Sequence, residues 1–340
     1  MTTISFPAEW YPQSAIQITW PHANTDWASI LDEAIAFYVN LSKKVLKHTK
    51  LLIVCPTVEE VKIHFTTEEL RNLIVTEIDS NDTWTRDHGA ISVLINHKPV
   101  IYDFGFNAWG LKFAANLDNQ ITTQLFEKNI YQTNVTYHNH LNFILEGGAI
   151  ESDGEGTLLT TSKCLLAPNR NQPLTKEEIE SYLINAFGLK RVLWLNSGFL
   201  AGDDTDNHID TLARFCNKNT IAYVKCDDEN DEHFLELKKM EDELKAFRTI
   251  EGKPYNLIAL PMAEPVYEED YRLPATYANF LIMNSVVLMP TYLSRTDLIA
   301  KKQLEKAFPE KEIIGIDCRT LIKQHGSLHC ITMQYPKGFL

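Results

Sequence analysis

Four short polar clusters recur along the chain at nearly equal intervals, and this spacing limits the folds that the chain can adopt. The clusters contain Asp87, Glu146, His208 and Cys330, and successive members lie 59, 62 and 122 residues apart. Polar clusters that recur at one period indicate a repeated supersecondary unit that presents one strand end per copy to a common centre. Because the last interval is about double, the spacing predicts a missing member near residue 270, in the segment 272–280.

Between these clusters the hydrophobic pattern predicts alternating strands and helices. Helices are predicted over 26–47, 175–187, 231–247 and 295–308, the first three with N-caps at Asp26, Thr175 and Asn230. Strands are predicted over 51–55, 91–95, 158–161, 192–195, 221–226, 257–260, 280–289, 313–316 and 328–334. Length alone suggests about two domains. No Pro-, Ser- or Gly-rich linker divides the chain, however, so we expect residues 1–340 to form one continuous α/β domain.

Charge and cysteine content exclude several classes of protein. The 45 acidic residues outnumber the 32 basic ones, giving a net charge of −13. Such a surface repels phosphate groups, so we expect neither nucleic acid nor membrane as a partner, whereas a small cationic substrate is suited to it. The six cysteines form no close pairs, and no secretion signal or phosphate-binding glycine loop is recognisable. We therefore expect a cytoplasmic protein with reduced thiols.

The residue types in the clusters point to one chemistry. Cysteine is the strongest neutral-pH nucleophile among side chains once its pKa is lowered, and His208 can move a proton near pH 7. His208 and Asp210 are two residues apart and would share one face of an extended strand. Asp87, Glu146 and Asp210 would hold a guanidinium group well. Together with Cys330 they indicate nucleophilic attack on a cationic amidine carbon.

The residues alone leave other interpretations open. A lone cysteine such as Cys330 is most often a small buried hydrophobic residue, and Trp84 is most simply a core residue. Asp206, His208 and Asp210 have a spacing compatible with the ligands of a metal-dependent amidohydrolase. The Glu-Gly-Gly sequence is most often a turn, and a structural or solvent-facing role is expected for three further histidines, His88, His325 and His329.

A series of motifs resembles the agmatine deiminases and bacterial-type peptidylarginine deiminases of the guanidino-modifying superfamily. The matching segments run in order along almost the whole chain and comprise 7–10, 19–21, 82–87, 106–110, 145–148, 153–161, 164–166, 168–171, 208–210, 277–280 and 329–332. The resemblance implies a pentein-type fold, a five-bladed pseudosymmetric α/β propeller of ββαβ modules around a central polar channel. That fold agrees with the interval of about 61 residues.

The same resemblance implies a role for each matching residue. Cys330 corresponds to the nucleophile, and His208 to the general acid and base. Glu146 corresponds to the carboxylate that contacts the guanidinium and supports proton transfer, and Asp87 and Asp210 to the carboxylates that grip the guanidinium nitrogens. No metal or organic cofactor is implied. Further candidates for substrate binding, chosen for the distal end of the substrate or its approach, are Trp84, Trp109 and Asp204.

The activity expected from this resemblance is hydrolysis of agmatine to N-carbamoylputrescine and ammonia through a thiouronium intermediate on Cys330, as part of polyamine metabolism. A deiminase for peptidyl or free arginine would use the same mechanism and stays open, as does the metal-dependent amidohydrolase. Two segments depart from the usual family pattern: residues 325–328 replace a Gly-rich run, and Asp206-Asn207 replaces an Asp-Gly pair. Homo-oligomer formation is left open.

Overall fold

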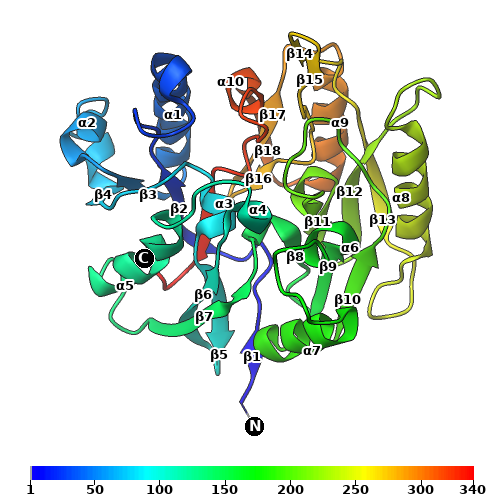
Figure 1. Ribbon diagram of the computed structural model, residues 1–340, viewed down its shortest axis with the longest axis horizontal. Helices are drawn as coiled ribbons and strands as arrows, with labels where there is room; N and C mark the ends of the chain where they lie inside the picture. The colour runs from blue at the N-terminus through cyan, green and yellow to red at the C-terminus, as the bar shows by residue number, and fades with distance from the viewer. Residues whose placement is uncertain (1) are drawn as a thin grey trace.

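Several sheets in the computed structural model, which describes residues 2–340, are built in the same order (Figure 1). In five of them an antiparallel strand pair is followed by a parallel pair. Their strands are β5 (Ile91–Ile95), β6 (Lys98–Gly105) and β7 (Thr136–Ile144); β8 (Ile150–Ser152), β9 (Thr157–Thr161) and β10 (Arg191–Leu195); β11 (Ala213–Asn217), β12 (Thr220–Lys225) and β13 (Asn256–Pro261); β16 (Leu281–Ile282), β17 (Val286–Thr291) and β18 (Glu312–Asp317); and β19 (Met333–Pro336), β2 (Gln13–Thr19) and β3 (Lys50–Cys55). The chain therefore repeats one sheet unit, as the polar spacing predicted.

Additional strands extend this pattern. Strand β1 (Ile4–Ser5) pairs with β5, β4 (Leu73–Glu77) pairs with β3, and β14 (Tyr267–Glu268) forms a separate hairpin with β15 (Tyr271–Arg272). In the sheet formed by β19, β2, β3 and β4, the C-terminal strand β19 lies against β2 near the N-terminus. The last strand of the chain thus shares a sheet with its second strand.

The longest helix in the connection between the two parallel strands of each repeated unit is taken as its crossover helix. These crossover helices are α1 (Leu31–Leu46), α5 (Ile121–Glu127), α7 (Lys176–Phe187), α8 (Phe234–Ala246) and α9 (Asp297–Ala307). Shorter helical segments are α2 (Val58–Lys62), α3 (Thr85–His88), α4 (Ala108–Leu111), α6 (Ser162–Leu165), α10 (Arg319–Ile322), η1 (Ala28–Ile30), η2 (Glu69–Arg71), η3 (Asp118–Gln120), η4 (Gly147–Ala149) and η5 (Ile209–Thr211). In Figure 1 the long helices lie toward the outside and the short segments α3 and α4 near the middle.

Helix α7 shows how the local sequence produces one of these elements. Thr175 caps its start: the Thr175 hydroxyl accepts from the Glu178 amide, and the Glu178 carboxylate accepts from the Thr175 amide at 2.8 Å. Gly188 ends the helix with φ +64°, a conformation that favours glycine. The buried residues Ile179, Leu183 and Phe187 are four residues apart, so one apolar stripe packs on the sheet. The predicted capping box is confirmed.

Several predicted boundaries are wrong for identifiable reasons. Helix α1 starts at Leu31 after η1, and α8 starts at Phe234, so neither Asp26 nor Asn230 is an N-cap. The predicted strand 280–289 is two strands, because the Met283 amide bonds to the Val286 carbonyl and turns the chain.

The segment 328–332 is likewise not a strand. There the amides of His329 and Cys330 donate to the Asn279 side chain instead of to a strand neighbour. Only Met333–Pro336 continues as β19. Among the helices of residues 2–340, none combines the length and the apolar character that crossing a bilayer requires.

Candidate active site

The predicted polar residues meet at one place because they occupy equivalent positions in the repeated units. Asp87 precedes β5, Glu146 precedes β8, His208 precedes β11 and Cys330 precedes β19, each by a few residues. The fifth member is Asn279, just before β16, inside the predicted segment 272–280. Each of these side chains is buried. The periodicity of the sequence therefore led to four of these residues and to the segment that contains the fifth.

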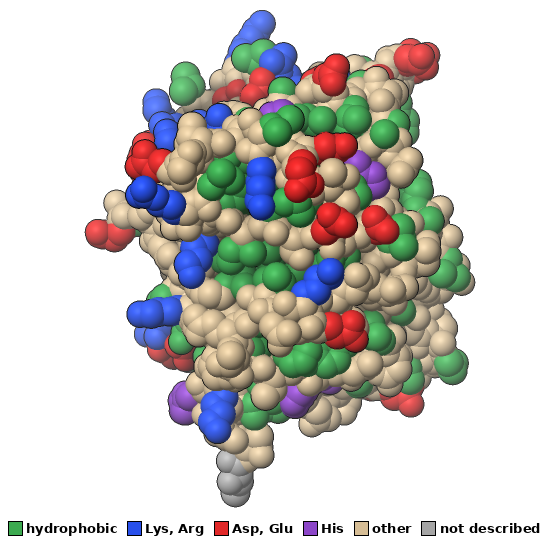
Figure 2. All heavy atoms as spheres, turned by 90° about the vertical axis from the view of Figure 1, so that its left-hand side faces the viewer, with side chains coloured by type: hydrophobic (Ala, Val, Ile, Leu, Met, Phe, Trp, Pro, Cys, Tyr) green, Lys and Arg blue, Asp and Glu red, His purple; other side chains and the backbone are tan. Residues whose placement is uncertain are grey.

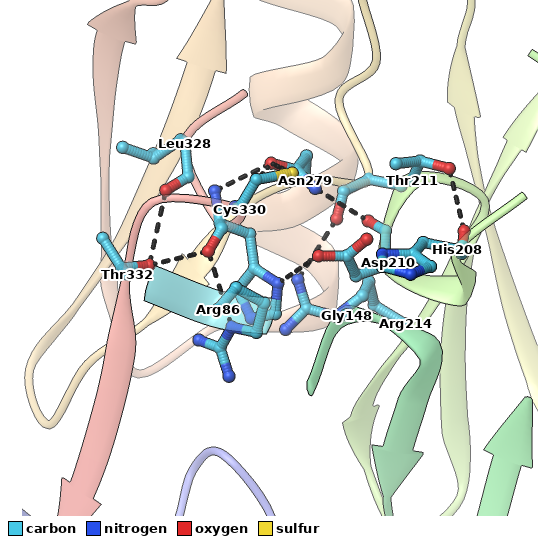
Figure 3. Close-up of polar contacts among 12 residues, drawn as sticks. Arg86, Gly148, His208, Asp210, Thr211, Arg214, Asn279, Leu328, Cys330 and Thr332 are labelled. Atoms are coloured by element: carbon cyan, nitrogen blue, oxygen red, sulfur yellow. Dashed lines mark hydrogen bonds and ion pairs between the residues drawn. The ribbon is translucent and has the colours of Figure 1, made fainter. Parts of the chain in front are cut away.

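The Cys330 thiol is buried and held by Asn279 (Figure 3). Its Sγ donates to the Asn279 Oδ1 atom at 3.4 Å, and the same oxygen accepts the amides of His329 and Cys330 at 2.8 and 3.3 Å. Burial, with the nearby Asp210 and Asp87 carboxylates, raises the pKa of the Cys330 thiol well above its ordinary value. A positive charge brought to this point would reverse the effect of the carboxylates and favour the thiolate.

His208 lies between carboxylates that favour its charged form. Its Nδ1 atom is 3.5 Å from the Asp87 Oδ1 atom, and Glu146 and Cys164 each place a polar atom within 4.8 Å of the ring. Burial opposes the charged ring, but Asp87, Cys164 and Glu146 raise the pKa of His208 well above its ordinary value. Glu146 is itself fixed by Arg170, whose Nε donates to the Glu146 Oε1 atom at 3.0 Å. His208 can therefore hold a proton close to Asp87.

His208 and Asp210 do not lie on an extended strand, so that expectation is wrong. His208 immediately precedes the 3-10 helix η5, and Asp210 lies within it. The Asp210 side chain accepts from His329, whereas His208 faces Asp87. The helical turn separates the two side chains, because residues two apart in a helix do not project from one face. Both still reach the same centre, from different sides.

The Glu-Gly-Gly sequence leads into the 3-10 helix η4 rather than forming an ordinary turn, and its glycines make the site possible. The Gly148 amide donates to the Asp87 Oδ1 atom at 3.0 Å. A Cβ atom at Gly148 would lie 2.6 Å from His208 Nδ1, 2.7 Å from Asp87 Oδ1 and 3.2 Å from Asp210 Oδ2. At Gly147 a Cβ atom would collide with the Arg86 carbonyl. Only glycine therefore lets the backbone approach these three side chains so closely.

A cavity of about 340 Å³ leads to Cys330 and Asp87. Trp84, Trp109 and Asp204, the further candidates for substrate binding, line it. Among the described residues its lining contains six aspartates and neither Lys nor Arg; the aspartates are Asp26, Asp82, Asp87, Asp118, Asp203 and Asp204. Figure 2 shows a face of the molecule on which acidic and basic side chains both occur. The charged side chains of the cavity lining are, by contrast, predominantly acidic. The cavity is suited to a cation.

Hydrogen bonds only partly compensate two aspartates of this lining for their loss of contact with water. Burial raises the pKa of both Asp82 and Asp118 to about 7, since the hydrogen bonds that they accept do not offset the loss of water. Asp206 does not belong to this lining and pairs with Arg170 at 2.6 Å and Lys112 at 3.0 Å. A cationic ligand would therefore favour ionised carboxylates in the cavity wall.

A second group of buried polar residues lies behind Asp210 and was not predicted. The Asp210 Oδ2 atom is 2.7 Å from His329 Nδ1, and His329 Nε2 is 2.7 Å from Glu9 Oε2. Arg214 bonds to both Glu9 and Glu151. His329 is thus buried between two carboxylates, not exposed to solvent. Two sequence features could have indicated this group. His329 is adjacent to Cys330, and Glu9 belongs to the motif 7–10.

Comparison with known families decides the family of the chain. The profile described as Porphyromonas-type peptidyl-arginine deiminase matches residues 5–336. The chain belongs to this family. The resemblance inferred from the motifs is therefore confirmed.

Relatives of this family member cover nearly its whole length. A solved structure named "Putative Arginine Deiminase", from Porphyromonas gingivalis, is 53% identical with a TM-score of 0.96, covering 99% of this chain and 100% of that chain. The C. jejuni agmatine deiminase, solved as a cysteine-to-serine variant with substrate bound, is 42% identical with a TM-score of 0.91, covering 100% and 98%. A Legionella pneumophila (strain Paris) protein named "Putative agmatine deiminase" is 34% identical, over 98% of this chain and 95% of its own length.

The metal-ligand set considered from the sequence is not assembled in this family member. Asp206 pairs with Lys112 and Arg170, and Asp210 pairs with His329. In residues 2–340 two other trios bring ligand atoms together, namely Glu146, Cys164 and His208, and Glu9, Glu151 and His329. Arg170 already bonds to the carboxylate of the first trio, and Arg214 to both carboxylates of the second. The carboxylates of both trios are thus already paired with a guanidinium.

A left-handed turn of four residues presents Trp109 to Asp87 in this deiminase-family chain. Residues 108–111 all have positive φ, with values of 51°, 56°, 87° and 69°. The turn directs Trp109 Nε1 to the Asp87 Oδ2 atom at 3.0 Å. The left-handed conformation costs roughly 1–2 kcal/mol for each residue that is not glycine. The contact with Asp87 is therefore made at the expense of backbone strain.

This strain predicts that Leu111→Gly stabilises the protein. Leu111 has φ 69° and a side chain that is 69% exposed, so glycine would relieve strain with little loss of packing. We expect the free energy of unfolding to rise by about 1 kcal/mol. The measurement is urea denaturation of both proteins.

Leu235→Gly is the matched control, because Leu235 is 70% exposed but lies in α8. There glycine should lower the free energy of unfolding by about 1 kcal/mol. Equal changes of the same sign in the two variants would contradict the strain argument.

Proposed function

We propose that the chain hydrolyses agmatine to N-carbamoylputrescine and ammonia, with Cys330 as the nucleophile. The observation that carries the proposal is the cavity that ends at Cys330 and Asp87 and is lined by six aspartates without Lys or Arg among the described residues. Agmatine carries a guanidinium at one end and an ammonium at the other, so both ends suit acidic surroundings. Relatives named agmatine deiminase span the whole chain.

The same lining favours agmatine over arginine. Free arginine carries an α-carboxylate, which needs a cationic partner when it is removed from water. Among the described residues that line the cavity, His325 is the one side chain that could supply such a charge. The aspartates would repel the carboxylate. The P. gingivalis relative named as an arginine deiminase makes arginine the second candidate.

In the first step the Cys330 thiolate adds to the guanidinium carbon. Asp87 and Asp210 accept hydrogen bonds from the guanidinium nitrogens and keep the substrate protonated, which makes its carbon electrophilic. The positive substrate also favours the thiolate, whose charge is unfavourable beside two carboxylates. His208 gives a proton to the departing nitrogen. The C–N bond breaks, ammonia leaves, and a thiouronium remains on sulfur.

In the second step water replaces sulfur on the same carbon. His208, now neutral, takes a proton from the water as the oxygen attacks. Glu146 lies beside His208 and favours the charged ring that results. The C–S bond then breaks as the new hydroxyl group loses its proton to solvent water, which releases N-carbamoylputrescine and restores the thiolate. No step requires a group beyond this chain, the substrate and water.

We propose further that the repeated sheet units form a five-bladed α/β propeller of ββαβ modules and that residues 1–340 are one domain. Five sheets with the same strand order and one crossover helix each support this arrangement. So do the five polar residues that precede equivalent strands and meet at one centre. All six cysteines are unpaired in the structure, which supports a reducing compartment such as the cytoplasm.

A comparison of substrates tests the proposed function. We expect ammonia and ureido product from agmatine, with kcat/KM at least about 100-fold above that for free arginine, because pairing or repelling one buried charge changes binding by several kcal/mol. An arginine peptide should also react slowly. Ammonia release and ureido product are measured for each compound. Turnover of arginine or the peptide without turnover of agmatine would reject the substrate while keeping the mechanism.

A further inference from the structure

One oxygen of the Asp210 carboxylate bonds to His329, and the other is free to bind a ligand. The Asp210 Oδ2 atom lies 2.7 Å from His329 Nδ1, whereas the Oδ1 atom has no hydrogen-bond partner among the described residues. The carboxylate is completely buried. An ionised oxygen that is buried and unpaired is costly unless a ligand pairs with it. Figure 3 shows Asp210 beside Cys330 and Asn279, where the substrate guanidinium would lie.

The other nitrogen of the His329 ring is held by a second carboxylate. His329 Nε2 lies 2.7 Å from the Glu9 Oε2 atom, and Glu9 Oε1 accepts the Ile282 amide at 2.6 Å. A carboxylate oxygen and a ring nitrogen this close need a proton between them. The hydrogen bonds that link Asp210, His329 and Glu9 therefore require two protons, one in each contact. Glu9 does not line the substrate cavity.

Glu9 is the group that can keep the second proton in place. Burial, Arg214 and Arg86 lower the pKa of His329, and Glu9 and Asp210 offset only part of this lowering. Burial also disfavours a charged Asp210, but the hydrogen bond from His329 holds the pKa of Asp210 below its ordinary value. Burial and the guanidinium groups disfavour the charged His329 ring, whereas the two carboxylate contacts at 2.7 Å favour it.

Three other titratable groups face this cluster. Glu151 bonds to Arg214, and burial raises its pKa to about 7. His208 also lowers the pKa of Asp210, whereas Asp87 and Asp210 repel each other.

We infer that Glu9 is a positioning residue for the deiminase reaction. It retains the proton on Nε2 of His329, and the doubly protonated ring orients Asp210 so that its Oδ1 atom faces the substrate. Glu9 touches neither substrate nor Cys330 and acts through His329 and Asp210 alone. The inference rests on the proposed function, in which Asp210 grips the guanidinium.

The test compares Glu9→Gln with Glu151→Gln. Both carboxylates are buried to the same degree and bond to Arg214, but only Glu9 bonds to His329. In Glu9→Gln we expect kcat/KM for agmatine to fall about tenfold at neutral pH and its acidic limb to move up by about one pH unit, because Asp210 loses a charged hydrogen-bond donor. Glu151→Gln should keep the acidic limb of the wild type. The same shift in both variants, or in neither, would overturn the inference.

Nitrogen-15 NMR of histidine-labelled protein gives a second measurement that needs neither substrate nor a variant of Glu9. We expect His329 in the wild type to show protons on both ring nitrogens, with the signals assigned by their loss in His329→Gln. A wild-type ring with an unprotonated Nε2 would overturn the inference even if Glu9→Gln failed to fold. Because no turnover is measured, this result also separates failure of the inference from failure of the agmatine assignment.

Discussion

Cys330→Ala is expected to lower ammonia release from agmatine by a factor of at least about 10⁴ while substrate binding is retained, because no other nucleophile replaces the sulfur. The cavity lining, which includes Asp87, stays in place, and so does Asp210, the second carboxylate proposed to bind the guanidinium. The change removes one buried atom, whose packing contribution is small. Turnover is measured as ammonia release, and binding of agmatine by calorimetry.

The control for this prediction is Cys216→Ala. Cys216 is also a buried free thiol, and burial raises its pKa to about 12, but it lies in β11 and does not line the cavity. We expect this variant to lose some stability and to keep its turnover. Undiminished ammonia release by Cys330→Ala, or an equal loss in both variants, would reject Cys330 as the nucleophile.

Gly148→Ala is expected to lower kcat/KM by roughly 10²-fold or more, because displacing catalytic groups by about 1 Å can cost that much. The added methyl would lie within 2.7 Å of both His208 Nδ1 and Asp87 Oδ1, so these side chains must move apart. Their contact at 3.5 Å favours the charged His208 ring. Steady-state kinetics with agmatine measure the loss, and its pH profile should change as the contact is broken.

Gly252→Ala provides the comparison for Gly148→Ala. A Cβ atom at Gly252 meets no heavy atom within 4 Å, although φ of +80° makes the substitution strained. Some loss of stability with unchanged kcat/KM is therefore expected. If Gly148→Ala retained wild-type kinetics, the close approach of this backbone would have no part in arranging His208 and Asp87.

Sequence periodicity identified the positions of the site better than the conformation at each position. The interval of about 61 residues led to Asp87, Glu146, His208 and Cys330 and to the segment containing Asn279, because each repeated unit places one polar residue before its first strand. The capping box of α7 was also readable, since it depends on residues three apart. The recurrence of one polar residue per unit and this one local cap were therefore predictable.

Features made by distant residues were not. His208 and Asp210 were expected on a strand, but they flank and occupy a 3-10 turn. The segment 328–332 was expected to be a strand, but the Asn279 side chain binds its amides from about 50 residues away. Hydrophobic alternation cannot distinguish a strand from a buried loop whose amides find such a partner.

The sequence by itself determined the residue types of the chemistry, their order and their recurrence at one interval. Only the tertiary structure decided which atoms face one another. Glu9 reaches His329 across 320 residues of sequence, and Gly148 brings its amide to Asp87 across 61. The physical reason is that periodicity records which side of each element is buried. The direction of a buried hydrogen bond depends on the partner that packing brings to it.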